Sequence, residues 1–467
     1  MMRRGYPLAV AVALLTTSAC ATVGPDYTRP DVTPPAMFRG AEAAPDATAP
    51  ALAETHWATV FVDEPLQELI GTALRENYDV RIAAARIAQA EATFGVTRSN
   101  QFPTVDAQAV GQGQRSSLQS STGDARTAGV IQLGGTASWD LDFWGRYRRA
   151  TESARAQLIA TEWGRHAVAA SLVSRVASAY YTLRALDLER EIAQRTIETR
   201  QESLRLTQVR ERGGATSLVD VRQAEQLVLG ARARLVDLDR LTAQQENLLS
   251  VLVGRDPGPV ARGRALTDQP HAPVVPAGLP SDLIERRPDV RIAEQQIIAA
   301  NAGIGVAKAA YFPRIALTGS GGVASTALSA LFTGAAGAWT AAASAVQPVF
   351  NAGRTRSQVA LAEARREEAE LAYRQTVQQA FREVSDALVG YQQTQELRAV
   401  QESLVDAARD ARRLADLRYQ GGASSYLDVL DSDTRLFDAE LGLVRARVGE
   451  LTTFVEIYRA LGGGWQD

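Results

Sequence analysis

The sequence predicts an internally duplicated α+β membrane protein in which each chain contributes four transmembrane strands and two long helical hairpins. Three observations predict this fold class. The two halves of the chain carry the same short motifs in the same order. Each half contains segments in which apolar and polar residues alternate strictly. Each half also contains a proline-free stretch long enough for a helix of about 100 Å, at about 1.5 Å per residue.

The composition excludes several classes of function. The 467 residues include 50 Lys+Arg and 53 Asp+Glu, and this balance gives no indication of nucleic-acid binding. The three histidines, His56, His166 and His271, are far apart in the sequence and lack a second ligand type at metal spacing. No phosphate-binding loop, zinc-protease helix or nucleophile elbow occurs. We therefore expect no metal, no cofactor and no catalytic residues, and the protein is not expected to be an enzyme.

The N-terminus has the pattern of an export signal. Arg3 and Arg4 precede an apolar stretch at residues 8–15, which is followed by small residues. A charged segment, a short apolar segment and a small-residue cleavage point are typical of a signal peptide. We assign residues 1–19 to this signal. Elsewhere the sequence has no run near the roughly 18 apolar residues that a spanning helix needs, so any membrane crossing is expected to use strands.

The only cysteine, Cys20, directly follows the predicted signal. A lone cysteine at this point is similar to the acceptor site of a bacterial lipoprotein, although Thr17 stands where such sites usually carry an aliphatic residue. The alternative is an incidental cysteine inside a discarded signal. We favour lipid attachment at Cys20, with a palmitate-type acyl chain, and treat residues 20–76 as a lipid-anchored N-terminal segment.

The repeated motifs define two homologous parts of the chain. The predicted repeats span residues 77–254 and 288–462, with a proline-rich linker at 255–287 and a tail at 463–467. The motifs that recur are DVRIA at 79–83 and 289–293, Phe-Pro at 102–103 and 312–313, Gly-Gly-Ala at 213–215 and 421–423, Ser217 with Ser425, and Asp220 with Asp428. We therefore expect both halves to fold alike.

Each repeat begins with a helix and a strand hairpin. The helices are expected at 77–99 and 288–309, and the hairpins at 104–143 and 314–350. Over residues 131–143 every odd position is apolar or glycine, and the strands have the length of a tilted membrane strand. The connecting segments are polar, and aromatic residues gather at the opposite end, as at a membrane interface. The aromatic residues are Phe102, Phe143, Trp144, Tyr311, Phe312 and Phe350. The alternative is a pair of amphipathic hairpins that cover a soluble core.

Each repeat continues as a long helical hairpin. Helices are expected at 145–212 and 353–419, with glycine turns at 212–217 and 420–425. Returning helices are expected from Ser217 to about residue 253 and from Ser425 to about residue 461. Apolar positions recur at three and four residues among many alanines and charges, which favours coiled-coil packing.

Four strands cannot form a closed barrel alone. A free sheet edge is not tolerated in lipid, and single-chain barrels begin at about eight strands. The missing strands must come from other copies, so the chain is expected to be an obligate homo-oligomer.

The sequence resembles the outer-membrane efflux proteins of the TolC and OprM type, specifically their lipoprotein branch. The residues that carry the resemblance are CATVGPDYTRPDVTPP at 20–35, NYDVRIAAARIAQAEA at 77–92, RRPDVRIAEQQIIAANAGIGVAKAAYFP at 286–313 and YQGGASSYLDVLD at 419–431. The resemblance covers nearly the whole mature chain. It implies a homotrimer with a 12-stranded barrel in the outer membrane and an α-helical periplasmic tunnel. It also implies an equatorial layer, which includes the stretch up to Leu69 and the linker.

The resemblance further implies partners and a function. The partners are a periplasmic adaptor, or membrane fusion protein, an inner-membrane pump of the RND class and outer-membrane lipid. The expected function is a passive export duct for drugs or other small molecules. Two alternatives remain at this point: the duct of a type I protein secretion system, and a periplasmic coiled-coil adaptor or scaffold.

The same resemblance implies a periplasmic gate at Tyr419, Asp428 and Asp431. An arginine found in some members is replaced here by Ser424. Like charges brought together by symmetry would attract cations. The alternative is helix capping, which we favour for Asp220 and leave open for Asp428. Asp431 lies beyond the cap and is the better gate candidate.

Adaptor docking is expected at the two glycine turns. The residues concerned are Gly213, Gly214, Ser217 and Asp220 in the first turn, and Gly421, Gly422 and Ser425 in the second. The sequence names neither the cargo nor the cognate pump.

Overall fold

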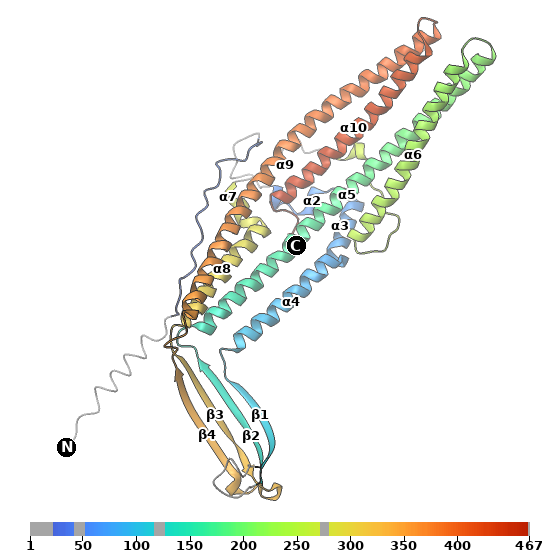
Figure 1. Cartoon of the computed structure of the whole chain (residues 1–467). Coiled ribbons are helices and arrows are strands. Elements are labelled where there is room, and N and C mark those ends of the chain that lie inside the picture. Colours follow the sequence, from blue (N-terminus) through green and yellow to red (C-terminus); the bar gives the residue numbers. More distant parts are fainter. Residues whose placement is uncertain (1–21, 42–51, 116–126, 271–279, 466–467) are drawn as a thin grey trace. The chain divides into compact units, whose positions relative to one another are not determined.

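The computed structural model describes residues 22–41, 52–115, 127–270 and 280–465 (Figure 1). The chain forms two compact units, each assembled from three separate stretches of sequence. The first consists of Met1–Asp31, Arg86–Thr161 and Ile292–Tyr373, and the second of Val32–Ala85, Glu162–Arg291 and Arg374–Asp467. Each unit thus contains parts of both predicted repeats.

The major helices occur as two matching sets. The first set is α4 (Tyr78–Ser99), α5 (Arg146–Arg212) and α6 (Leu218–Leu252), and the second is α8 (Pro288–Ala309), α9 (Arg354–Gln420) and α10 (Tyr426–Ala460). Corresponding helices have the same lengths, 22, 67 and 35 residues. The internal duplication in the predicted fold class is therefore confirmed in the secondary structure. Among the described residues, no helix combines the length and apolar character needed to cross a membrane.

Shorter elements lie outside these sets. The N-terminal segment forms η1 (Leu52–Glu54), α2 (Trp57–Val60) and α3 (Glu64–Glu76), and the linker region forms η2 (Leu266–Asp268) and α7 (Pro280–Arg286).

The four strands form one continuous antiparallel sheet in the order β1-β2-β3-β4 (Figure 1). They are β1 (Thr104–Arg115), β2 (Thr127–Leu141), β3 (Arg314–Ser325) and β4 (Gly337–Val346), and the last connection contains η3 (Leu328–Ala330) and η4 (Gly334–Ala336). Pairing of β2 with β3 joins the two predicted hairpins into one sheet. Part of the predicted polar connection after β1 lies outside the described residues.

The end of β2 corrects one sequence-based boundary. The alternating pattern predicts a strand through Phe143, but the strand ends at Leu141. Asp142 instead accepts hydrogen bonds from the backbone amides of Tyr147 and Arg148, at 3.1 and 2.8 Å, and so satisfies the first turn of α5. Gly145 has a φ of +75°, a conformation that favours glycine, and lies in the short connection between strand and helix.

The register places the apolar residues of all four strands on the same face. Trp139 lies opposite Leu317, which in turn lies opposite Ala343. On the alternate rows most partners are polar or small, as in the row Asp106, Thr136, Ser320 and Thr340. Because strand residues alternate between faces, the sheet has one apolar and one polar face over its full width.

The core of the second unit forms around the middle of α5. Val176, Tyr180 and Leu183 are fully buried at helical spacing, and they belong to one apolar cluster with Ile70 of α3 and Val455 of α10. The N-terminal segment and the two hairpins therefore share a single core in this unit.

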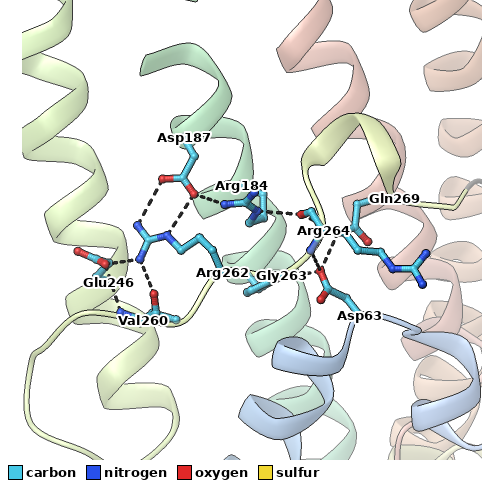
Figure 2. Close-up of polar contacts among 10 residues, drawn as sticks. Asp63, Arg184, Asp187, Glu246, Val260, Arg262, Gly263, Arg264 and Gln269 are labelled. Carbon is cyan, nitrogen blue, oxygen red and sulfur yellow. Dashed lines mark hydrogen bonds and ion pairs between the residues drawn. The ribbon is translucent and has the colours of Figure 1, made fainter. Parts of the chain in front are cut away.

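A buried carboxylate fixes the linker to this core (Figure 2). Asp63 is only 1% exposed. Its Oδ2 accepts hydrogen bonds from the Tyr180 hydroxyl at 2.9 Å, the Arg264 amide at 3.1 Å and the Gln269 side chain at 2.8 Å. The Tyr180 hydroxyl also accepts a hydrogen bond from the Gly263 amide at 2.9 Å. Asp63 packs so closely against Gly263 that a side chain at that position has no room.

Arg262 fastens the same linker across the first helical hairpin (Figure 2). Nε of its guanidinium lies 3.2 Å from Oδ2 of Asp187 on α5, and the guanidinium also forms an ion pair with Glu246 of α6. Burial disfavours the charged form of Glu246, but hydrogen bonds from Arg262 and the Val260 amide outweigh it and hold the pKa of Glu246 below its ordinary value. The linker thus crosses both helices and holds them together.

The substitution Tyr180→Phe tests this anchor. It removes one donor to a buried carboxylate and one acceptor for a backbone amide, so we expect a loss of about 1–3 kcal/mol in unfolding free energy. The matched control is Tyr181→Phe, because the neighbouring Tyr181 is also buried but its hydroxyl makes no hydrogen bond to a described residue. Denaturant titration of the detergent-solubilised protein provides the comparison. Equal effects of the two substitutions would contradict the anchoring role.

Candidate functional site

The two glycine turns have the same backbone structure. In the first, the Ala215 amide donates to the Arg210 carbonyl at 2.8 Å, and in the second, the Ala423 amide donates to the Arg418 carbonyl at 2.8 Å. Gly214 and Gly422 have φ of +72° and +76°. This left-handed conformation after a helix satisfies its last carbonyls and explains why glycine occupies both positions.

The helix that leaves the first turn has a complete cap. The hydroxyl oxygen of Ser217 accepts a hydrogen bond from the Asp220 amide at 3.3 Å. The Asp220 carboxylate accepts one from the Ser217 amide at 3.0 Å. Hydrogen bonds from Thr216 and the Ser217 amide hold the pKa of Asp220 below its usual range. The stabilisation is therefore present at neutral pH and is lost as the pH falls through the folded-state pKa of Asp220. Asp220 has the capping role.

The second turn lacks this cap. The Ser425 side chain makes no capping hydrogen bond, and the exposed Asp428 carboxylate contacts no partner among the described residues. The Ser424 hydroxyl is buried and makes no hydrogen bond to a described residue. The structure therefore does not give Asp428 the capping interaction that Asp220 has, although their motifs align.

Asp431 has an intrahelical partner that the sequence reasoning missed. Its carboxylate pairs with Nε of Arg435 at 2.8 Å, one helical turn along α10. The i,i+4 spacing was the available signal. The Asp431 side chain is 59% exposed, so it remains accessible to solvent while its charge is partly balanced.

Tyr419 contacts both hairpins at their turns. Its ring centroid lies 5.1 Å from that of Tyr426, and the guanidinium of Arg210 lies 4.9 Å from the Tyr419 ring. The Tyr426 hydroxyl lies 2.8 Å from the Ser203 hydroxyl of α5. Arg210 was not a sequence candidate, because it comes from the other repeat and only the fold brings it to Tyr419.

Cys20 lies outside the described residues, but the segment that follows it is well placed. The Val23 amide donates to the Trp144 carbonyl at 3.1 Å. Thr22 packs against Gly145, and a Cβ at Gly145 would lie 2.7 Å from Thr22. Trp144 stacks on Phe312 with centroids 4.6 Å apart. The segment after Cys20 is thus bound to the aromatic junction between strands and helices of the first unit.

No group of three or more potential metal ligands occurs in the part of the chain that the structure describes. The tips present exposed turns, unpaired or partly paired carboxylates and a cation–π contact. This arrangement suits a protein contact or an electrostatic barrier, and it offers no arrangement for covalent or metal-assisted chemistry.

Comparison with known proteins identifies the family. The sequence model of the outer membrane efflux protein family matches the chain twice, over residues 69–255 and 279–463. The chain belongs to this family. The protein is therefore an outer-membrane channel component of an efflux system and not an enzyme, and the predicted resemblance and fold class are confirmed.

Relatives and solved structures match over nearly full length. This efflux protein is 37% identical over 465 residues to the antibiotic efflux pump outer membrane protein ArpC of Pseudomonas putida, covering 98% of this chain and 96% of ArpC. It is 33% identical over 461 residues to the cation efflux system protein CusC of Escherichia coli O6:H1, covering 98% of both. The open state of the MtrE outer membrane channel of Neisseria gonorrhoeae matches with a TM-score of 0.86 at 32% identity, covering 96% of this chain and 99% of MtrE.

The unequal caps give a direct prediction. Ser217→Ala removes a capping hydrogen bond and is expected to destabilise the start of α6 by about 1 kcal/mol, which corresponds to roughly fivefold faster amide exchange there. Ser425→Ala, the matched change at the second turn, is expected to leave exchange at the start of α10 unchanged. Hydrogen–deuterium exchange with mass spectrometry measures both, and equal acceleration at the two helices would refute the difference in capping.

Proposed function

We propose that the protein is the outer-membrane duct of a tripartite efflux system and acts as a homotrimer. The observation that carries the proposal is the four-stranded sheet. It has one apolar face, and its edge strands β1 and β4 each have a hydrogen-bonded neighbour on one side only. Three copies would supply twelve strands and close the sheet into a barrel, which lipid requires. The apolar face would contact the membrane, and the polar face would line a water-filled lumen.

The proposed partners are a periplasmic adaptor and an inner-membrane pump of the RND class. The chain has no site for chemistry or for energy conversion among its described residues, so transport through it is passive and the energy comes from the pump. The exposed turns around Gly213, Gly214 and Ser217 and around Gly421, Gly422 and Ser425 are the proposed adaptor contacts. They are the points at which the helical hairpins reverse, and their backbones are alike.

The proposed cargo is small. ArpC is named for antibiotic efflux and CusC for cation efflux, and neither name refers to protein secretion. These names favour a duct for small molecules over the type I secretion alternative. Because cargoes of such different chemistry are named among relatives, we place the selection of cargo in the pump and not in the duct.

Lipid attachment at Cys20 forms part of the proposal. The described chain begins at Thr22, two residues after Cys20 in the sequence, and Thr22 contacts the junction at Gly145. Trp144 and Phe312 lie at that junction, and aromatic residues favour the membrane interface. An acyl chain on Cys20 would thus enter the bilayer beside the aromatic residues, with the helical part of the protein in the periplasm.

Metabolic labelling tests the anchor. Cells fed labelled palmitate are expected to incorporate label into the wild-type protein and not into Cys20→Ser. Label retained by the Cys20→Ser protein, or absent from the wild-type protein, would refute attachment at Cys20.

The proposed gate consists of Tyr419, Asp428 and Asp431. Threefold symmetry would bring three copies of each acid together at one end of the tunnel, where their charges would attract cations and repel anions. Ser424 supplies no cation at this gate, and Arg210 places a positive charge 4.9 Å from the Tyr419 ring.

Conductance in planar bilayers tests the duct and its gate. We expect the purified mature protein to give discrete current steps, and Asp428→Ala with Asp431→Ala to lower the preference for cations over anions severalfold, because the charge ring is removed. Asp438→Ala is the matched control, since Asp438 is an exposed acid one heptad beyond Asp431. No current steps from the wild-type protein would reject the duct. Equal cation preference in the double variant and the control would reject the charged gate.

A further inference from the structure

Two acids of α10 each contact arginines from two other helices. Asp433 is the first. Its Oδ2 lies 2.8 Å from Nε of Arg200 on α5, and its Oδ1 lies 3.5 Å from Nε of Arg412 on α9. The carboxylate therefore connects α10 both to its own hairpin partner and to the other hairpin of the same protomer.

Glu440, one heptad further along α10, repeats the arrangement. Its Oε2 lies 2.9 Å from Nη2 of Arg195 on α5, and its Oε1 lies 3.7 Å from Nη2 of Arg409 on α9. The seven-residue spacing puts both acids on one face of α10. We refer to the contacts of Asp433 and Glu440 with these four arginines as the arginine rungs.

The rung at Asp433 is buried. The Arg200 side chain is 6% exposed, and that of Asp433 is 13% exposed. Arg200 also donates from Nη1 to the Leu227 carbonyl of α6 at 2.9 Å, and its guanidinium lies 5.1 Å from the Phe437 ring. Through Arg200 and Asp433 together, all four helices of the two hairpins are connected at one level.

Between this level and the turns, the ion pairs of the described residues stay within single helices. They are Arg205 with Glu202, Arg222 with Glu225, Arg413 with Asp410 and Arg435 with Asp431. The hairpins touch there through the Ser203–Tyr426 hydroxyl pair, the Arg210–Tyr419 contact and a small apolar cluster around Tyr426 and Leu430. Among the described residues, ion pairs between the hairpins therefore end at Asp433.

We propose that the arginine rungs hold the two hairpins of a protomer together and confine gate opening to the turns beyond Asp433. This inference rests on the proposed function as a gated duct. Breaking the ion pair of Arg200 with Asp433 leaves an unpaired charge in a poorly solvated place, so the helices resist separation at this rung. The arginines at Glu440 are 57% and 59% exposed, so that rung adds a weaker restraint. The hydroxyl, cation–π and apolar contacts beyond Asp433 include no ion pair between the hairpins and carry no such penalty. Residues 413–432 then move against α5 and α6, while the helices on the other side of Asp433 stay paired. The rung residues position the gate and do not line it.

Site-specific cross-linking tests the position of this hinge. Cysteine pairs Arg210→Cys with Tyr419→Cys, beyond the rungs, and Arg195→Cys with Glu440→Cys, at the rungs, are treated with a short bifunctional thiol reagent. Current in planar bilayers is compared before and after cross-linking of the same variant, with single-cysteine variants as controls. We expect the 210–419 cross-link to lower the current at least tenfold and the 195–440 cross-link to change it less than twofold.

The outcomes separate this inference from the proposed function. A tenfold loss from the 195–440 cross-link would overturn the inference, because the hairpins would then separate along their length. An unaffected current with the 210–419 cross-link would overturn it as well. If the untreated protein carried no current, the proposed duct itself would fail and the inference with it.

A second set of variants measures the restraint without cross-linking. Asp433→Asn with Glu440→Gln removes both rung charges, and we expect a severalfold increase in current. Asp239→Asn is the matched control, because Asp239 pairs with Arg190 at 2.7 Å within the first hairpin alone. If the rung variant folds, assembles and conducts like this control, the rungs do not restrict opening.

Discussion

The backbone hydrogen bonds at the two edges of the sheet are the constraint on which the whole structure depends. β1 and β4 each have a partner on one side only, and the register makes one face of the sheet apolar from end to end. Hydrocarbon offers these edge groups no hydrogen-bonding partner, and water would not stabilise the apolar face. In the proposed trimer, copies of the same sheet satisfy both requirements at once. The proposed oligomer thus follows from strand number, and the duct would follow from closing the sheet.

Gene duplication explains the equal helix lengths, but the two repeats have diverged where their chemistry matters. The first turn keeps a complete cap at Ser217 and Asp220, whereas the second leaves Asp428 without a partner among the described residues. The linker also stabilises the first hairpin, because Arg262 connects α5 to α6 and Asp63 connects the linker to the core. The first hairpin therefore has the capped turn and the linker anchor, and Asp428, without a partner among the described residues, belongs to the second.

Sequence reasoning reached the local features and missed the long-range ones. Helix lengths were predictable because proline is absent from the long helices and glycine marks the turns: the predicted 145–212 compares with Arg146–Arg212. The pairing of β2 with β3 was not predictable, because its register joins residues from 174 positions apart (Leu141 with Ile315) to 194 apart (Ile131 with Ser325), and no local pattern encodes it. At the tips, the cap of Asp220 was readable from Ser-x-x-Asp spacing. The contacts of Arg210 and Arg200 could not be predicted from the sequence, since their partners lie on the other repeat.

The mass of the assembled particle tests the central claim most directly. Native mass spectrometry of the purified mature protein, released from detergent micelles, counts the copies that close the sheet. Three copies per particle are expected, with dissociation to single chains only on unfolding. A stable, folded single chain that stays dispersed in buffer without detergent would contradict the account, because its sheet edges and apolar face would then need no partner.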